Sequence, residues 1–219
     1  MTAVVSTQRR TLLFDLDGTL IDSAVGITRC VSHALAALGH PGLPGAELRG
    51  WIGPALRVSF SAVLPSSEVE AAVMHYRERF DAEGWQEHTI YDGVADALAS
   101  LHGRGHRLVV VTAKNEPHAR RIIDHLPFGQ LVEDVIGATE DGRLSHKPEL
   151  IGEALGRLDL QPADCIMIGD RYLDIEGANH HGMDSAGVLW GFGSEQELRT
   201  AGAGQLLSTP RQLPGMALS

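Results

Sequence analysis

The residues that most clearly suggest chemistry stand near the start of the chain, in the stretch TLLFDLDGTLIDS (Thr11–Ser23). Asp15 and Asp17 follow a short apolar run there, and residues two apart on a strand point to the same face. Two neighbouring carboxylates repel each other unless a cation or a shared proton intervenes, which raises the pKa of one of them. Such a pair is costly to build for stability alone. We therefore interpret it as a divalent-metal and acid–base site.

Gly18 comes directly after this pair. Glycine lets the backbone turn sharply because it has no Cβ, so the two carboxylates would stand at the end of a strand, beside a tight turn. A strand that simply ends in an Asp/Gly turn is the alternative interpretation of this stretch when it is considered alone. The choice between them depends on the rest of the chain.

Other polar residues also follow apolar runs. Thr112 ends the run HRLVVVT, Asp170 follows the run CIMIG, and Lys147 lies in a polar loop before a helix. Ligands of open parallel sheets bind at the carboxyl ends of the strands, where these residues would join Asp15 and Asp17. Thr112 with the N–H groups of a following helix start would form an anion nest, and Lys147 supplies a point charge suited to phosphate.

Two further carboxylates complete the set. Asp170 and Asp174 are four residues apart and would share a helix face or flank a loop. Magnesium prefers an octahedron of oxygen ligands that includes several waters, and these carboxylates fit that preference. The sequence therefore predicts a Mg²⁺ site beside a phosphate-binding site.

The elements that must position these residues follow from the spacing of apolar residues. The chain alternates between strand and helix after Tyr91, which predicts parallel strands, right-handed crossovers and helices on both faces of the sheet. The expected fold class is α/β, with a Rossmann-like parallel sheet. Strands are expected at Thr11–Leu16, His106–Thr112, Val132–Ala138, Cys165–Ile168, Ala186–Leu189 and Gly204–Leu207.

Between the first strand and this alternating part, apolar residues recur at helical spacing. We expect residues 22–88 to form a small, mobile, all-helical cap, and residues 1–21 and 89–219 to form the α/β core. Ser23 is the expected N-cap of the first helix, and His40–Glu47 is expected to be a loop. Arg57, in the cap, is a candidate for binding a second anionic group of the substrate. A solvated helix arginine is the alternative.

Composition excludes several function classes. The net charge of −10 argues against a nucleic-acid polymer or an anionic membrane as partner. No apolar run has the length of a membrane span, and the first ten residues lack the pattern of a signal peptide. The two cysteines, Cys30 and Cys165, indicate free thiols in a reducing cytoplasm. Only Lys114 and Lys147 are lysines among 18 basic residues. The sequence leaves open whether the protein is a monomer or a homodimer.

Four segments together resemble a known family. DLDGT (15–19), VVVTA (109–113), Lys147 in HKPE and GDRYLD (169–174) are similar to the four motifs of the haloacid dehalogenase-like hydrolase superfamily, and they occur in the same order. A helical cap after the first motif resembles the phosphoglycolate phosphatase-like group. The segments WIGPALRVSF, SHKPELI, GDRYLDIEGA and GVLWGFGSEQEL also resemble a 5′-nucleotidase-like branch.

This resemblance implies a role for each matching residue. Asp15 would be the nucleophile that forms an aspartyl-phosphate, and Asp17 would protonate the leaving alcohol and then activate water, with its main-chain carbonyl on the metal. The implied phosphate-binding residues are Gly18, Thr112, Ala113 and Lys147, and the implied Mg²⁺ ligands are Asp15, Asp17, Asp170 and Asp174. Ala113 departs from the family, which often has Ser or Asn there, so one side-chain hydrogen bond near the nucleophile is missing.

The expected function is a Mg²⁺-dependent phosphatase that acts on a small phosphorylated metabolite. A dehalogenase would not need Asp17, and a phosphonatase would need a cap lysine, which Ser23–His88 lacks. A phosphomutase shares all four motifs and stays open as an alternative. A non-catalytic binding protein on the same fold is a second alternative, although Asp15 and its partners are intact.

Overall fold

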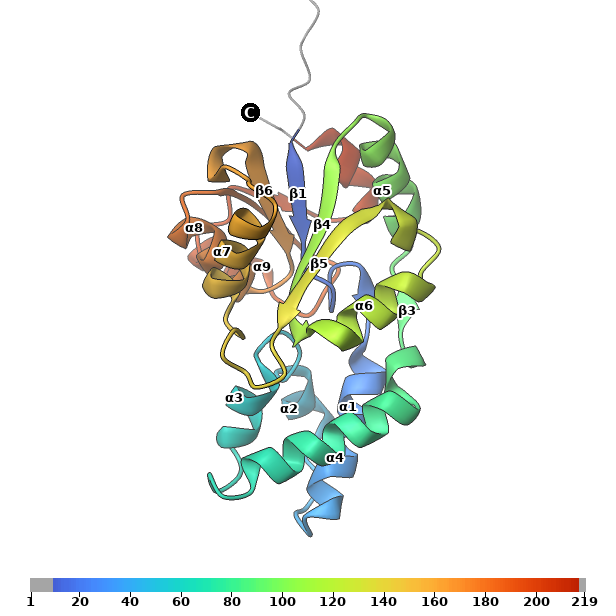
Figure 1. The fold of residues 1–219 in the computed structure, drawn as a ribbon, viewed down its shortest axis with the longest axis vertical. Helices are drawn as coiled ribbons and strands as arrows, with labels where there is room; N and C mark the ends of the chain where they lie inside the picture. The colour runs from blue at the N-terminus through green and yellow to red at the C-terminus, as the bar shows by residue number, and fades with distance from the viewer. Residues whose placement is uncertain (1–9, 217–219) are drawn as a thin grey trace, which may run out of the picture.

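The computed structural model describes residues 10–216 and contains a six-stranded sheet with the order β5-β4-β1-β6-β7-β8. Every neighbouring pair in this sheet is parallel. Figure 1 shows the sheet in the upper part of the molecule, with helices on either side of it. Its strands are β1 (Thr11–Phe14), β4 (Arg107–Asn115), β5 (Val132–Ala138), β6 (Cys165–Gly169), β7 (Asp184–Val188) and β8 (Gln205–Leu207). The predicted α/β fold with a parallel sheet is confirmed.

Helices cover both faces of the sheet because its strands are apolar on both sides. Leu12 and Phe14 pack into a cluster with α5 and α6, while Leu13 packs on the opposite face with α7 and α8. This burial on both faces explains why the strands are continuous apolar runs in the amino-acid sequence. The α-helices of this part are α5 (Val94–Gly103), α6 (Glu116–His125), α7 (Lys147–Arg157), α8 (Tyr172–His180) and α9 (Glu195–Thr200). Short 3₁₀ turns span Gly84–Gln86, Gly129–Leu131, Pro162–Asp164 and Pro210–Gly215.

A separate helical layer, here called the cap (residues 22–88), lies beyond the carboxyl ends of the strands, in the lower part of Figure 1. Its α-helices are α1 (Ala24–Ala37), α2 (Gly45–Arg49), α3 (Leu56–Ser61) and α4 (Val69–Ala82). Two short strands, β2 (Ile21–Asp22) and β3 (Thr89–Ile90), pair antiparallel where the chain enters and leaves this layer. Among residues 10–216, no helix is both long and apolar enough to cross a membrane.

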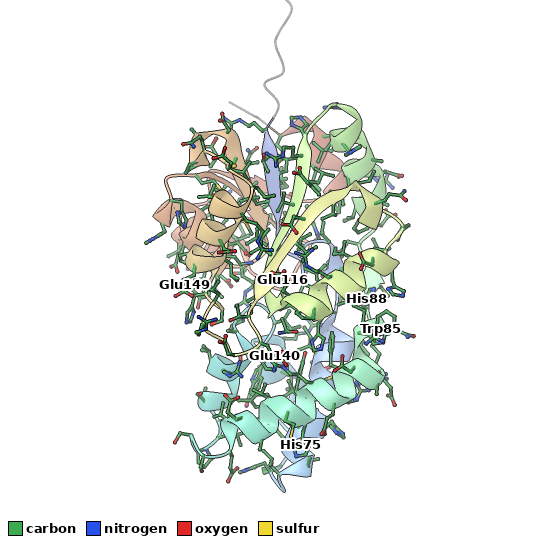
Figure 2. The ribbon with its side chains drawn as sticks, viewed as in Figure 1. His75, Trp85, His88, Glu116, Glu140 and Glu149 are labelled. Atoms are coloured by element: carbon green, nitrogen blue, oxygen red, sulfur yellow. The ribbon has the colours of Figure 1, made fainter. Side chains whose placement is uncertain are left out.

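Hydrogen bonds and ion pairs join the cap to the core at several points. Figure 2 places Glu140 at the boundary between the two layers, and its carbonyl accepts hydrogen bonds from Arg57 and Arg77 of the cap. At a second point, Asp81 of the cap pairs with His118 and Arg121 of α6. These contacts hold the cap over the strand ends.

Four local predictions differ from the structure in whole or in part. Part of the expected loop His40–Glu47 belongs to helix α2. Ser23 is the N-cap residue of α1, as predicted, but its hydroxyl makes no capping bond, because Asp22 accepts the N–H of Ala24 and the carbonyl of Glu87 accepts the N–H of Gly26. Lys147 is the first residue of α7 rather than part of the preceding loop. Strand β4 continues to Asn115, three residues beyond its predicted end.

Candidate active site

The aspartate pair lies where strand β1 ends. The N–H of Asp15 donates to the carbonyl of Ile168 on β6 at 2.9 Å, which holds the chain beside its neighbour after Phe14. Gly18 has φ of +90°, and a Cβ at this position would overlap the Asp170 carboxylate. Glycine is therefore required here by both conformation and space, and the turn brings Asp15, Asp17 and Asp170 to one edge of the sheet.

Lys147 connects three elements at the centre of the site. Its Nζ lies 2.8 Å from Asp15 Oδ1 and 2.8 Å from Asp174 Oδ1, and it donates to the carbonyl of Val111 at 2.9 Å. All of these side chains are buried. A buried ammonium held between two carboxylates is fixed in position. It can therefore bind phosphate without first having to be ordered.

Burial and neighbouring charge shift the pKa values of this cluster. Burial, opposed by Lys147 and reinforced by Asp174, raises the pKa of Asp15 from 3.8 to about 6. Burial and the charges of Asp15 and Asp174 raise the pKa of Asp170 well above its ordinary value. Burial alone would lower the pKa of Lys147, but the two carboxylates raise it above its usual range. The site thus carries more negative charge than Lys147 compensates.

That uncompensated charge fits a divalent cation. Ligand oxygens of Asp15, Asp170 and Asp174 lie within 4.8 Å of one another. Asp170 is oriented by the N–H of Phe192 at 2.7 Å and by the Thr19 hydroxyl at 3.4 Å. A purely oxygen donor set of this kind suits Mg²⁺ rather than a thiolate-seeking metal.

The predicted phosphate-binding residues of β4 are also at this edge. Thr112 is buried, and Thr112 and Ala113 line the same cavity as Asp15 and Asp17. The Thr112 hydroxyl accepts the N–H of Lys114 at 3.2 Å. The following helix, α6, begins at Glu116, but β4 continues to Asn115, so that three strand residues separate Thr112 from the helix start. Any anion nest at Thr112 is therefore made by strand and turn backbone.

Lys114 is a site residue that the sequence analysis did not assign. Its Nζ lies 3.0 Å from Asp17 Oδ2 and 4.9 Å from the centroid of the Phe80 ring in the cap. The available signal was composition, because both lysines of the chain, Lys114 and Lys147, lie in this site. Lys114 thus contacts both Asp17 at the strand ends and Phe80 in the cap.

A cavity that is partly open to solvent lies between these residues and the cap. Arg57 lines it, but its Nε and Nη2 donate to Glu70 at 2.6 and 2.8 Å. The role predicted for Arg57, binding a second anion of the substrate, stays a prediction. Arg171, next to Asp170, donates to Glu197 at 2.9 Å and to the carbonyl of Ile52 in the cap.

The model of one protein family, described as haloacid dehalogenase-like hydrolase, matches residues 12–188, which is most of the chain. The chain belongs to the haloacid dehalogenase-like hydrolase family. The predicted resemblance is thereby confirmed, and the enzyme class is that of a phosphoric monoester hydrolase.

Within this family, the chain is 45% identical over 190 residues to a protein from Pseudomonas aeruginosa named 5′-nucleotidase, covering 86% of each chain. It is 32% identical to a phosphoglycolate phosphatase from Pectobacterium atrosepticum, and the match covers 84% of this chain and 81% of that protein. It is also 39% identical to the tyrosine-protein kinase PtkA from Mycobacterium tuberculosis. That match covers 83% of this chain and 62% of PtkA.

Solved structures of the family superpose on the whole fold. A predicted phosphatase from Clostridium acetobutylicum aligns with a TM-score of 0.91 at 36% identity, covering 95% of this chain and 98% of that one. PtkA from Mycobacterium tuberculosis aligns with a TM-score of 0.82 at 34% identity, covering 96% of this chain and 100% of that one. The sheet and the cap are thus both common to relatives of this chain.

Proposed function

We propose that this hydrolase is a Mg²⁺-dependent phosphatase that cleaves a small phosphorylated metabolite through an aspartyl-phosphate. The observation that carries the proposal is the buried Lys147, held at 2.8 Å from Asp15 and Asp174, beside the crowded carboxylate of Asp170. The names of its relatives, 5′-nucleotidase and phosphoglycolate phosphatase, support a phosphate ester as substrate. The two names imply different alcohols as the leaving group of that ester.

In this proposal, Asp15 attacks phosphorus through a carboxylate oxygen, and the bond from phosphorus to the leaving alcohol breaks. Asp17 donates a proton to the leaving oxygen, and its Oδ1 is buried with no hydrogen-bond partner among residues 10–216, so it is available for that contact. Asp17 then takes a proton from the water that hydrolyses the acyl phosphate and regenerates Asp15.

Other residues hold the phosphoryl group. Lys147 and Thr112, with the backbone at Gly18 and Ala113, bind its oxygens and stabilise the charge that develops on them. Asp15, Asp170 and Asp174, with the Asp17 carbonyl, would hold Mg²⁺, which would neutralise negative charge on the same oxygens when bound.

We propose the same domain division as the sequence suggests, with residues 22–88 as a moving cap over a core of residues 1–21 and 89–219. Opening would admit the ester, and closure would exclude water from the reaction. A cytoplasmic location is part of this proposal, supported by the two buried free thiols, Cys30 and Cys165.

Removal of the metal should test this function directly. In EDTA we expect release of inorganic phosphate from phenyl phosphate to fall at least about a hundredfold, and Mg²⁺ should restore it. Mg²⁺ should also raise the unfolding temperature, because it binds the native carboxylate cluster and not the unfolded chain. Full activity in metal-free buffer would exclude the proposal. A phosphomutase would instead isomerise a sugar phosphate without releasing stoichiometric phosphate.

A further inference from the structure

We propose that the cavity between cap and core is a leaving-group subsite that selects alcohols carrying an uncharged planar ring. This inference rests on the proposed phosphatase function. Nucleosides and aryl alcohols share this planar-ring chemistry, and the experiment below separates them. Its basis lies in three features of the cavity wall: aromatic rings, one unpaired donor, and cations that are already paired.

Aromatic rings form the cap side of the cavity. Tyr76 and Phe80 of α4 stack with ring centroids 5.9 Å apart and an interplanar angle of 12°, and both line the cavity. Trp51 lines it too and is fixed edge-on against Phe60 at 5.0 Å. Flat, rigid side chains bind planar rings through offset or edge-to-face contacts with little loss of side-chain entropy. Ile27 and Val73 add further apolar surface to the wall.

The core side offers an unpaired donor. Asn115 lines the cavity, and its Nδ2 is buried without a hydrogen-bond partner in the described part of the chain. A buried donor left unpaired costs about 1–3 kcal/mol, and an acceptor on the leaving group would remove that cost. Asp17 Oδ1, also unpaired, would meet the leaving oxygen. The ligand is thus expected to present polar atoms at two places and an apolar ring between them.

The cations of the wall are committed to protein carboxylates. Lys114 pairs with Asp17 at 3.0 Å, and Arg57 pairs with Glu70 at 2.6 Å. Arg77 donates to the carbonyl of Glu140 and lies 3.9 Å from its carboxylate.

His118 completes this set of paired groups. It contacts Asp81 at 3.1 Å, and burial lowers the pKa of His118 to about 4, so that it is neutral at pH 7. A second anion on the substrate would have to compete with these carboxylates for the same cations. The wall therefore favours an uncharged leaving group over a carboxylate such as that of glycolate.

The first experiment compares four substrates with the Mg²⁺-loaded wild-type protein: adenosine 5′-monophosphate, phenyl phosphate, glycerol 3-phosphate and phosphoglycolate. We expect kcat/KM for at least one ring-bearing ester to exceed that for both acyclic esters by at least about tenfold. Preference for adenosine 5′-monophosphate would assign a nucleoside that accepts from Asn115, and preference for phenyl phosphate would assign an aryl alcohol and refute the contact with Asn115. A higher value for either acyclic ester would overturn the subsite. Absence of phosphate release from all four would instead refute the phosphatase function.

Two variants then test which residues cause the preference for a ring-bearing ester. Asn115→Ala should lower the ratio of kcat/KM for adenosine 5′-monophosphate to that for phenyl phosphate about tenfold, because phenol offers no further acceptor to Asn115. Trp51→Leu should lower the ratio for the preferred ring-bearing ester to glycerol 3-phosphate by a similar factor. Asn179→Ala and Trp85→Leu are the matched controls.

These controls lie outside the cavity and should leave the ratios unchanged. Asn179 of α8 donates to the carbonyl of Ala201, Arg121 lies over the Trp85 ring, and neither Asn179 nor Trp85 lines the cavity. Unchanged ratios in Asn115→Ala and Trp51→Leu would overturn the assignment of these residues. A drop in phosphoglycolate hydrolysis alone in Arg57→Ala would favour a second-anion site at Arg57 instead. Should a variant fold poorly, the wild-type comparison still decides the proposal.

Discussion

Asp15→Asn is expected to reduce turnover to background, at least about 10⁴-fold below wild type, while the fold stays intact. An amide cannot attack phosphorus to form the acyl phosphate, so the loss falls on kcat. Phosphate release measures the effect, and Asp124→Asn, an exposed aspartate on α6, is the matched control. A variant that kept more than about one hundredth of the wild-type rate would show that Asp15 is not the attacking group.

The same variant should be more stable than wild type in EDTA. The rise in the pKa of Asp15 from 3.8 to about 6 means that its ionised form is disfavoured in the folded state. Wild type therefore loses stability as pH rises from about 4 through 6, by about 3 kcal/mol. Asparagine carries no such cost, so the advantage should appear above pH 6 and shrink below pH 4. Denaturant unfolding at pH 4 and pH 8 measures it.

Lys147→Met should cost both activity and stability. Methionine fills similar space but leaves Asp15 and Asp174 buried without their common cation, and removing one partner of a buried ion pair typically costs about 3–5 kcal/mol. Loss of the charge that we propose binds phosphate should lower kcat/KM on the order of a thousandfold. Unfolding in EDTA and phosphate release in Mg²⁺ report the two effects separately.

Arg157→Met tests whether removing any cation from α7 causes the same losses of stability and activity as Lys147→Met. Arg157 lies on the same helix, but it is partly exposed and pairs with Glu116 and Glu153 at the surface. Exposed pairs contribute little, so the unfolding free energy should change by less than about 1 kcal/mol and turnover should stay near wild type. Similar losses in both variants would show that the α7 fold, and not the Lys147 charge, determines the effect.

The parallel sheet and the positions of Asp15 and Asp170 could be predicted because local sequence determines them. A strand buried on both faces is a continuous apolar run, and the first polar residue after it must lie at the carboxyl edge of the sheet. Gly18 marks the turn for the same local reason, since its positive φ excludes most other residues. Each of these inferences needs only a few neighbouring residues.

Lys114 and Asn115 were missed because their position depends on a partner strand. Polar residues after Thr112 look like the end of a strand, but pairing with β5 continues past a bulge until Asn115 faces Ala138. The pairing partner of Arg57, Glu70, is 13 residues away on another helix. Helix α2 is five residues long, and its one buried large residue, Leu48, packs into the cap cluster. Such contacts are tertiary, and single-sequence periodicity does not contain them.

The two-residue strands β2 and β3 have a consequence for how this protein can change. They bring the entry and exit of residues 22–88 side by side, with Ile21 opposite Ile90 and Asp22 opposite Thr89. A segment whose two ends already meet can be lengthened, shortened or exchanged without moving β1, which leads to Asp15, or α7, which begins at Lys147. New alcohols can thus be recruited by changing one contiguous stretch of the gene, while the residues proposed for phosphoryl transfer, which lie outside it, stay the same.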